Sequence, residues 1–173
     1  MSDRKVVLVA SMLALLTGCS NAAEGVGEVT AEFDDERYRG ITLGETRDHQ
    51  ASATWSSFGP VTILNLQAHD PQAESMMKNV FTLEISVMEA SNSPQVNSAS
   101  FSYWPEGMGH KFYSSEETAV TVTLETYRLG ENAHAVGTFS GRMCAKASFY
   151  SEADTSDCKD VSGTFDTQLL KGS

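Results

Sequence analysis

Apolar and polar residues alternate with a period of two along most of the chain, the pattern of half-buried β-strands. The clearest run covers residues 79–89, where every second residue is a large apolar one: Phe81, Leu83, Ile85 and Val87. Similar runs cover 29–33, 38–43, 51–55, 61–68, 96–104, 112–113, 119–127, 134–149 and 161–170. Turn residues separate these runs. The pattern therefore predicts about eight to ten strands in an all-β domain.

Two of the predicted strands contain the same three-residue step. Gly137-Thr138-Phe139 in one recurs as Gly163-Thr164-Phe165 in the other. Because side chains two positions apart share a face of a strand, Phe139 and Phe165 are expected in the same core. The matched steps suggest that the two strands are neighbouring antiparallel partners.

At most one short helix is expected. Asp70 is a good helix N-cap and Pro71 a good first helical residue, so Pro71 to Lys78 is the predicted helix. The pattern predicts a single antiparallel β-sandwich or a partly closed barrel, and it does not distinguish the two.

The first 18 residues have the composition of a secretory signal. A basic start at Arg4 and Lys5 precedes an apolar run from Val6 to Leu16, and small residues follow it. The run is shorter than the roughly 18 residues that a transmembrane helix needs. Residues 1–18 are therefore predicted to be a signal peptide that is removed.

The end of this segment, Leu16-Thr17-Gly18-Cys19, resembles the lipobox of bacterial lipoproteins. The resemblance implies that Cys19 carries diacylglycerol, that the peptide bond before it is cut, and that its amine is also acylated, for example by palmitate. Ser20 is similar to the residue after the cysteine in lipoproteins sent to the outer membrane of Gram-negative bacteria. The alternative is an ordinary signal peptide with a chance cysteine.

The resemblance divides the chain into three parts. Residues 1–18 are the signal, 19–28 are the lipidated cysteine and a flexible tether, and 29–173 are the β-rich domain. The repeated Gly-Thr-Phe strands also look like the C-terminal strands of small β-rich envelope lipoproteins, a weak similarity that implies no activity.

The chain is acidic, with 23 Asp and Glu residues against 12 Lys and Arg and a net charge of −11. Because residues 1–18 carry a net charge of +1, their removal leaves a charge near −12. Such a surface repels phosphate backbones and anionic headgroups, so no nucleic-acid partner is expected, and the lipid anchor must hold the protein at the membrane.

Cys144 and Cys158 remain once Cys19 is assigned to the lipid. In an oxidising envelope compartment we expect them to form a disulfide. The alternatives are two reduced thiols or, with less support, a zinc site, because no histidine lies near either cysteine in sequence and the pair lacks Cys-x-x-Cys spacing.

The sequence contains no catalytic motif of the common enzyme classes. Its four histidines (His49, His69, His110 and His134) are scattered, and we interpret them as surface residues rather than metal ligands. The acidic residues Asp154, Asp157 and Asp160 lack the spacing of an EF-hand loop and are interpreted as a solvated loop. No cofactor or metal is predicted.

The most suggestive stretch for binding is residues 101–113, in which aromatic pairs flank a glycine-containing loop. Aromatic residues at loops are common in surfaces that bind sugars, peptides or proteins, although most pack in cores or at strand edges. The candidate ligand-binding residues are Tyr103, Trp104, His110, Phe112 and Tyr113.

These observations favour a membrane-anchored envelope lipoprotein with a non-enzymatic binding or accessory domain and a protein or glycan partner. One alternative is a glycan-acting hydrolase whose carboxylates meet only in the fold. Another is an acidic inhibitor of a basic enzyme, which rests on charge alone.

Overall fold

The computed structural model describes residues 24–34, 36–45, 50–90 and 93–172. In these residues the chain is all-β. The strands are β1 (Gly25–Phe33), β2 (Glu36–Leu43), β3 (Ala53–Phe58), β4 (Val61–His69), β5 (Val80–Ala90), β6 (Ser93–Trp104), β7 (Phe112–Ser114), β8 (Val120–Arg128), β9 (His134–Lys146), β10 (Asp154–Gln168) and β11 (Leu170–Lys171). The predicted fold class is confirmed.

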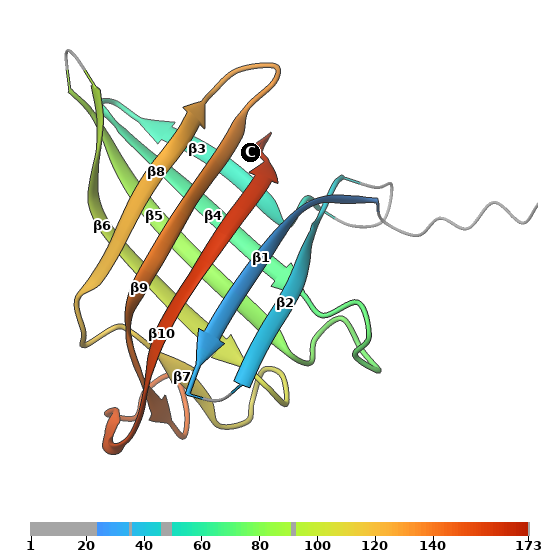
Figure 1. Cartoon of the computed structure of the whole chain (residues 1–173), viewed down its shortest axis with the longest axis vertical. Coiled ribbons are helices and arrows are strands. Elements are labelled where there is room, and N and C mark those ends of the chain that lie inside the picture. The colour runs from blue at the N-terminus through green and yellow to red at the C-terminus, as the bar shows by residue number, and fades with distance from the viewer. Residues whose placement is uncertain (1–23, 35, 46–49, 91–92, 173) are drawn as a thin grey trace, which may run out of the picture.

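The strands form one sheet that curls into a partly closed ring. Their order is β11-β3-β4-β2-β1-β10-β9-β7-β6-β5, β5 pairs again with β4, and β8 pairs with β9. Figure 1 shows two crossing layers: a front layer of β8, β9, β10, β1 and β2, and a back layer of β3, β4, β5 and β6. The ring is weakly closed between β2 and β4, whose pairing consists of Ile41 with His69. Only β11 and β3 pair in parallel among the described strands.

The core between the layers is aromatic. Phe81 of the back layer lies 5.4 Å, between ring centroids, from Phe139 of the front layer and 5.7 Å from Phe101. The rings of Phe33 and Tyr103 form a second pair, with centroids 4.8 Å apart. The alternation predicted for residues 79–89 is confirmed, because the four alternating side chains Phe81, Leu83, Ile85 and Val87 are buried.

The repeated Gly-Thr-Phe steps are neighbours, as predicted. β9 and β10 are antiparallel, and their register places Gly163 opposite Phe139 and Phe165 opposite Gly137. Each phenylalanine ring lies over the glycine of the other strand, so a Cβ on Gly137 would come 2.7 Å from Cζ of Phe165. The two glycines thus provide the space that lets both rings enter one core.

A methyl group at position 163 tests this arrangement. In Gly163→Ala the new Cβ would overlap the Phe139 ring and the carbonyl oxygen of Thr30, so we expect a loss of about 1–3 kcal/mol in the free energy of unfolding. Gly25→Ala is the control, since its Cβ would meet its nearest neighbour at an ordinary 3.7 Å. Equal denaturant midpoints for the two variants would contradict the prediction.

The predicted disulfide is present. Cys144 and Cys158 are direct cross-strand partners on β9 and β10, and a disulfide joins them. Their Cα atoms are 4.0 Å apart, just below the usual range of about 4.4–6.8 Å, because residues directly opposite each other in an antiparallel pair approach closely.

The predicted helix at Pro71 to Lys78 is not formed; this segment consists of turns and bends. Asp70 does cap the backbone N–H of Gln72, at 2.8 Å, but its other carboxylate oxygen accepts a hydrogen bond from the Asn79 amide. The segment is therefore closed into a loop, and so short an isolated helix would not offset its nucleation cost.

Strand boundaries near both ends of the domain also differ from the prediction. The tether was expected to extend to residue 28, but β1 begins at Gly25. Gly27 is not a linker residue: a Cβ there would overlap Thr167 of β10, so the glycine allows the two strands to approach. The strand predicted over 161–170 is β10, which begins at Asp154 and ends at Gln168, and Leu170 belongs to the separate strand β11. β10 begins earlier because Cys158 to Asp160 continue the pairing with β9 and, on the far side of a bulge, Asp154 pairs with Ala145.

Two tyrosines, Tyr38, which is buried, and Tyr103, which is half-buried, make the fold sensitive to alkali. Burial raises the pKa of Tyr38, whose hydroxyl donates to the carbonyl of Ala68 at 2.7 Å, and raises the pKa of Tyr103 to about 12. In the unfolded chain both would ionise near pH 10. Folding therefore favours their neutral forms, and this stability is fully present below about pH 10 and lost as the pH rises toward 12.

We expect the melting temperature to fall between pH 10 and 12. The Tyr38→Phe variant removes one ionisable group and should show a shallower fall, whatever its stability at neutral pH. Identical slopes for the parent chain and the variant would contradict the assignment of this pH dependence to Tyr38.

Candidate binding surfaces

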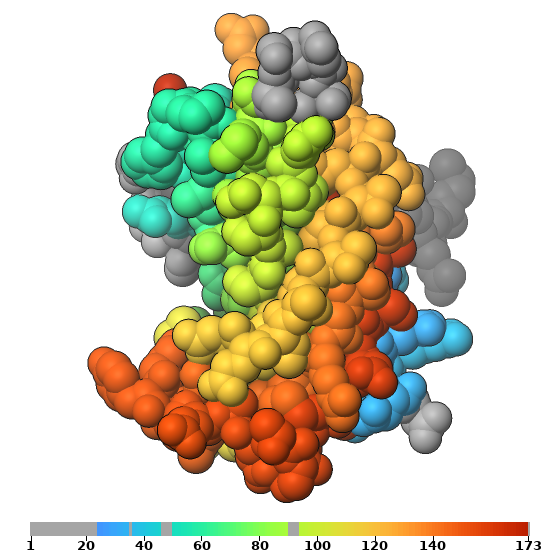
Figure 2. Space-filling view, turned by 90° about the vertical axis from the view of Figure 1, so that its left-hand side faces the viewer, coloured from blue at the N-terminus to red at the C-terminus, as the bar shows by residue number. Residues whose placement is uncertain are grey.

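Three adjoining loops form one end of the molecule. They are residues 70–79 after β4, 105–111 after β6 and 147–153 after β9, and together we call them the loop end. The backbone N–H of Asn79 donates to the carbonyl of Pro105 at 3.0 Å, which joins the first two loops. The ring of Phe149 in the third loop lies 5.0 Å from that of Trp104, the last residue of β6, from which the second loop starts. The segment around residues 147–153 forms the lower end in Figure 2.

Asn79 holds this end together. It has a positive φ of 53°, uncommon for a residue other than glycine. Its amide nitrogen donates to Asp70 at 2.5 Å, and its amide oxygen accepts from the Tyr103 hydroxyl at 2.5 Å. Because these bonds use both ends of the side chain, the loop of residues 70–79 is fixed against the strands below it.

The predicted binding residues lie at this end, but most of them pack inward. Trp104 and Phe112 are buried and stacked, with ring centroids 4.0 Å apart, in a small cluster with Val80. Tyr103 packs against the main core. Burial leaves these rings little surface for a ligand, and their predicted binding role stays a prediction.

Tyr113 and His110 are more accessible. The Tyr113 ring is half-buried between two ammonium groups, with Lys111 at 5.6 Å and Lys159 at 5.7 Å from its centroid. Lys111 pairs with Asp157 at 2.5 Å and Lys159 with Asp34 at 2.7 Å. These hydrogen bonds raise the pKa of both lysines. His110 is exposed.

The exposed apolar residues of the loop end were not singled out from the sequence. Of the seven large hydrophobic side chains that are exposed in the described residues, five belong to these loops: Met76, Met77, Met108, Phe149 and Tyr150. Tyr150 is fully exposed and Phe149 is 59% exposed. Phe149 had been assigned to a strand, but β9 ends at Lys146 and leaves it in the loop. The adjacent aromatics Phe149-Tyr150 before a polar run were the available signal.

Acidic residues surround this apolar surface. The acidic side chains on or beside the three loops outnumber the basic ones, with Asp70, Glu74, Glu106, Glu152, Asp154 and Asp157 against Lys78, Lys111 and Lys146. Lys78 Nζ lies 3.7 Å from Glu74 and 3.8 Å from Glu106. The rim of the loop end is therefore negative, and it favours a partner with basic residues.

A pair of carboxylates lies far from the loop end. Glu28 of β1 and Asp166 of β10 are direct cross-strand partners beside a shallow hollow on the front layer. Arg39 neutralises Glu28 at 2.6 Å, and His134 Nε2 contacts Asp166 at 2.7 Å. Each carboxylate is thus engaged by a basic side chain of a neighbouring strand, whereas the two carboxyl groups of a glycosidase face the substrate.

The histidines serve separate contacts. His69, expected at the surface, is buried, and its Nδ1 lies 2.8 Å from the carbonyl oxygen of Met76. His49 and Cys19 lie outside the described residues. Within the described ranges, no group of three or more His, Cys, Asp or Glu side chains is placed to hold a metal ion.

Comparisons with protein-family models, with curated proteins and with solved structures give no match to this chain. Among the described residues there is no helix long and apolar enough to cross a membrane.

Proposed function

We propose that the protein is a lipid-anchored lipoprotein of the cell envelope, in the outer membrane of a Gram-negative bacterium, whose β-domain is a non-enzymatic binding module. The loop end would hold a protein partner. The observation that carries this proposal is the concentration of exposed apolar side chains on three adjoining loops. Exposed apolar patches with polar rims are common at protein interfaces, and methionines adapt to the partner's shape.

The register of the sheet supports this use of the loop end. β1 begins beside the end of β10, where Gly27 pairs with Thr167, whereas the loop end adjoins the start of β10 at Asp154. Thr167 and Asp154 pair with Ala135 and Ala145 of β9, which are ten residues apart, so at a rise of about 3.3 Å per residue the two ends are separated by roughly 33 Å. A tether that enters at Gly25 would therefore leave the loop end free to meet a partner away from the anchor.

Photo-crosslinking in the intact envelope tests the proposal. A photoreactive residue in place of Tyr150 should give a discrete product with a partner, and Phe149→Ser and Met108→Ser should reduce its yield. The control is the same photoreactive residue in place of Thr138, which is exposed on the front layer. Equal products from both positions, or none from position 150, would refute the loop end as the binding surface.

The anchor has its own prediction. Cys19→Ser should abolish lipidation and move the protein out of the detergent phase without lowering its melting temperature, because Cys19 precedes β1 in sequence. Partitioning in a phase-separating detergent measures the first effect and thermal unfolding the second. A variant that remains wholly in the detergent phase would contradict the lipid anchor.

A further inference from the structure

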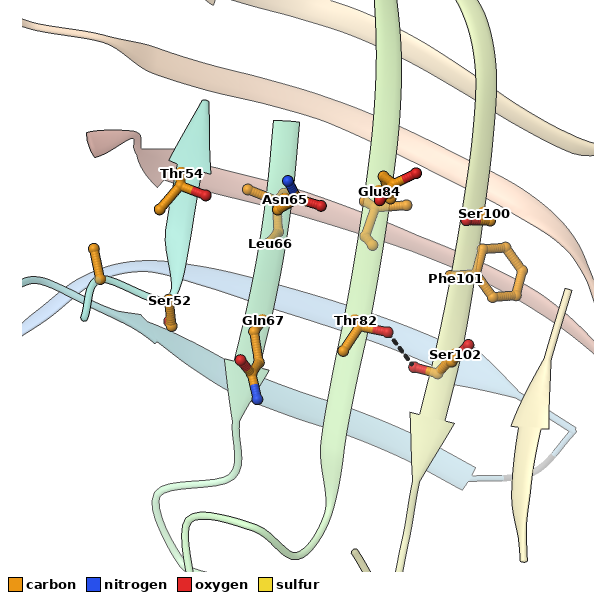
Figure 3. Close-up of a pocket in the computed structure, with 12 residues that line it drawn as sticks. Ser52, Thr54, Asn65, Leu66, Gln67, Thr82, Glu84, Ser100, Phe101 and Ser102 are labelled. Carbon is orange, nitrogen blue, oxygen red and sulfur yellow. Dashed lines mark hydrogen bonds between the residues drawn. The ribbon is translucent and has the colours of Figure 1, made fainter. Parts of the chain in front are cut away.

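The outer face of the back layer has a polar hollow that the loop end does not include. It has a volume of about 350 Å³ and is lined from four neighbouring strands. Thr54 of β3, Asn65 of β4, Glu84 of β5 and Ser100 of β6 are successive cross-strand partners and form one row. Gln67 and Thr82 belong to the next row, and Figure 3 shows the rows side by side across the strands.

The polar groups of this hollow are largely unused by the protein. Within the described part of the chain, the side chains of Asn65, Gln67 and Glu84 take part in no ion pair or hydrogen bond. The outer face of the front layer differs, since Arg39 there pairs with Glu28 and Thr30 shares a hydrogen bond of 2.8 Å with Thr164. The hollow thus presents free amide donors and acceptors around one free carboxylate.

We propose that this hollow binds an oligosaccharide that is neutral or carries amino groups. Sugar hydroxyls both donate and accept hydrogen bonds, as the amides and hydroxyls of the two rows do. Because neighbouring strands lie about 4.8 Å apart, a sugar chain laid across them meets a new polar side chain at every strand.

The charge of the hollow selects among sugars. Glu84 accepts hydrogen bonds from hydroxyl or ammonium groups, and its charge makes these bonds stronger than neutral ones. The same carboxylate, in a chain of net charge −11, repels sugars that carry carboxylates or sulfates.

The test is a titration with three pentasaccharides of the lipoprotein, which is purified from the envelope in detergent. Binding is monitored through the backbone amide chemical shifts. The probes are the pentamers of N-acetylglucosamine, glucosamine and galacturonic acid. We expect saturable shifts in β3 to β6 with the first two and none with the acidic one. No saturable shift with either of the first two, shifts confined to the loop end or the front layer, or equal binding of galacturonate would overturn the proposal.

Two substitutions distinguish the contribution of hydrogen bonds to the affinity from the contribution of the Glu84 charge. Asn65→Ala should weaken both glucosamine pentamers about fivefold, and Glu84→Gln should weaken the amino form about tenfold and the N-acetylated form less. Thr138→Ala, exposed on the front layer, is the matched control and should leave both affinities unchanged. These side chains are outside the core, so melting temperatures should not change. A control as damaging as Asn65→Ala would also overturn the assignment.

Discussion

Replacing Phe139 with alanine is expected to lower the free energy of unfolding by about 3–5 kcal/mol. The ring is buried and reaches from the front layer to two aromatic side chains of the back layer, with Phe81 at 5.4 Å and Phe101 at 5.7 Å between centroids. Its loss would open a cavity where the two layers meet, and Gly163, the residue opposite, has no side chain to fill it. Phe165→Ala should cost a similar amount, since that ring is buried over Gly137.

Denaturant unfolding measures both losses. Phe58→Ala is the matched control, because Phe58 is 68% exposed and its truncation should change stability by less than about 0.5 kcal/mol. A loss below about 1 kcal/mol at both Phe139 and Phe165 would show that these rings do not support the core. Combining Phe139→Ala with Gly163→Ala should cost less than the sum of the single changes, because the methyl group would occupy part of the vacated space.

Removing the disulfide is expected to cost about 3 kcal/mol, the value for a closed loop of roughly 15 residues. Cys144 and Cys158 are 14 positions apart in sequence. The loosening should be local, because β9 and β10 continue to pair beyond the cysteines from Lys159 to Gln168. Phe149 packs on Trp104 and Phe112, so its contact should slow the opening of the loop without replacing the covalent bond.

The double variant Cys144→Ala with Cys158→Ala allows this cost to be measured without reductant. Amide exchange should accelerate first in residues 147–159 and last in β4 and β5. Thiol labelling of the native protein provides the control for the pairing itself, and two reactive thiols at these positions in unreduced protein would contradict it. Uniform acceleration across the sheet would show that the disulfide supports the whole fold.

The order of apolar and polar residues determined the fold class and most of the core. Alternation in residues 79–89 placed Phe81, Leu83, Ile85 and Val87 inside. A shift of the register by one residue would turn these side chains to the solvent, so the pattern fixes which face of the strand is buried. The repeated Gly-Thr-Phe step also identified β9 and β10 as partners, because in an antiparallel pair the glycine of each strand lies opposite the phenylalanine of the other and leaves space for its ring. The disulfide was predicted from the number of cysteines and from the oxidising compartment that the resemblance of residues 16–19 to a lipobox implies.

Only the tertiary structure decided the segments whose neighbours are distant in sequence. Asp70 and Pro71 have the local chemistry of a helix start, yet hydrogen bonds from Asn79 to Asp70 and from Tyr103 to Asn79 close that segment into a loop. Gly25 and Gly27 resemble a linker until Gly25 is paired with Leu43 of β2 and Gly27 with Thr167 of β10. Local propensity is weak compared with such contacts.

The candidate surfaces divide in the same way. The sequence determined that an aromatic stretch lies at residues 101–113, but not which rings would be covered. Trp104 and Phe112 stack on each other, while Phe149 and Tyr150, from a loop some forty residues away, remain exposed beside them. The polar row from Thr54 to Ser100 exists only because four strands align in register. Alternation along a strand can be read from its own residues, whereas a surface built across strands depends on pairings that no single segment encodes.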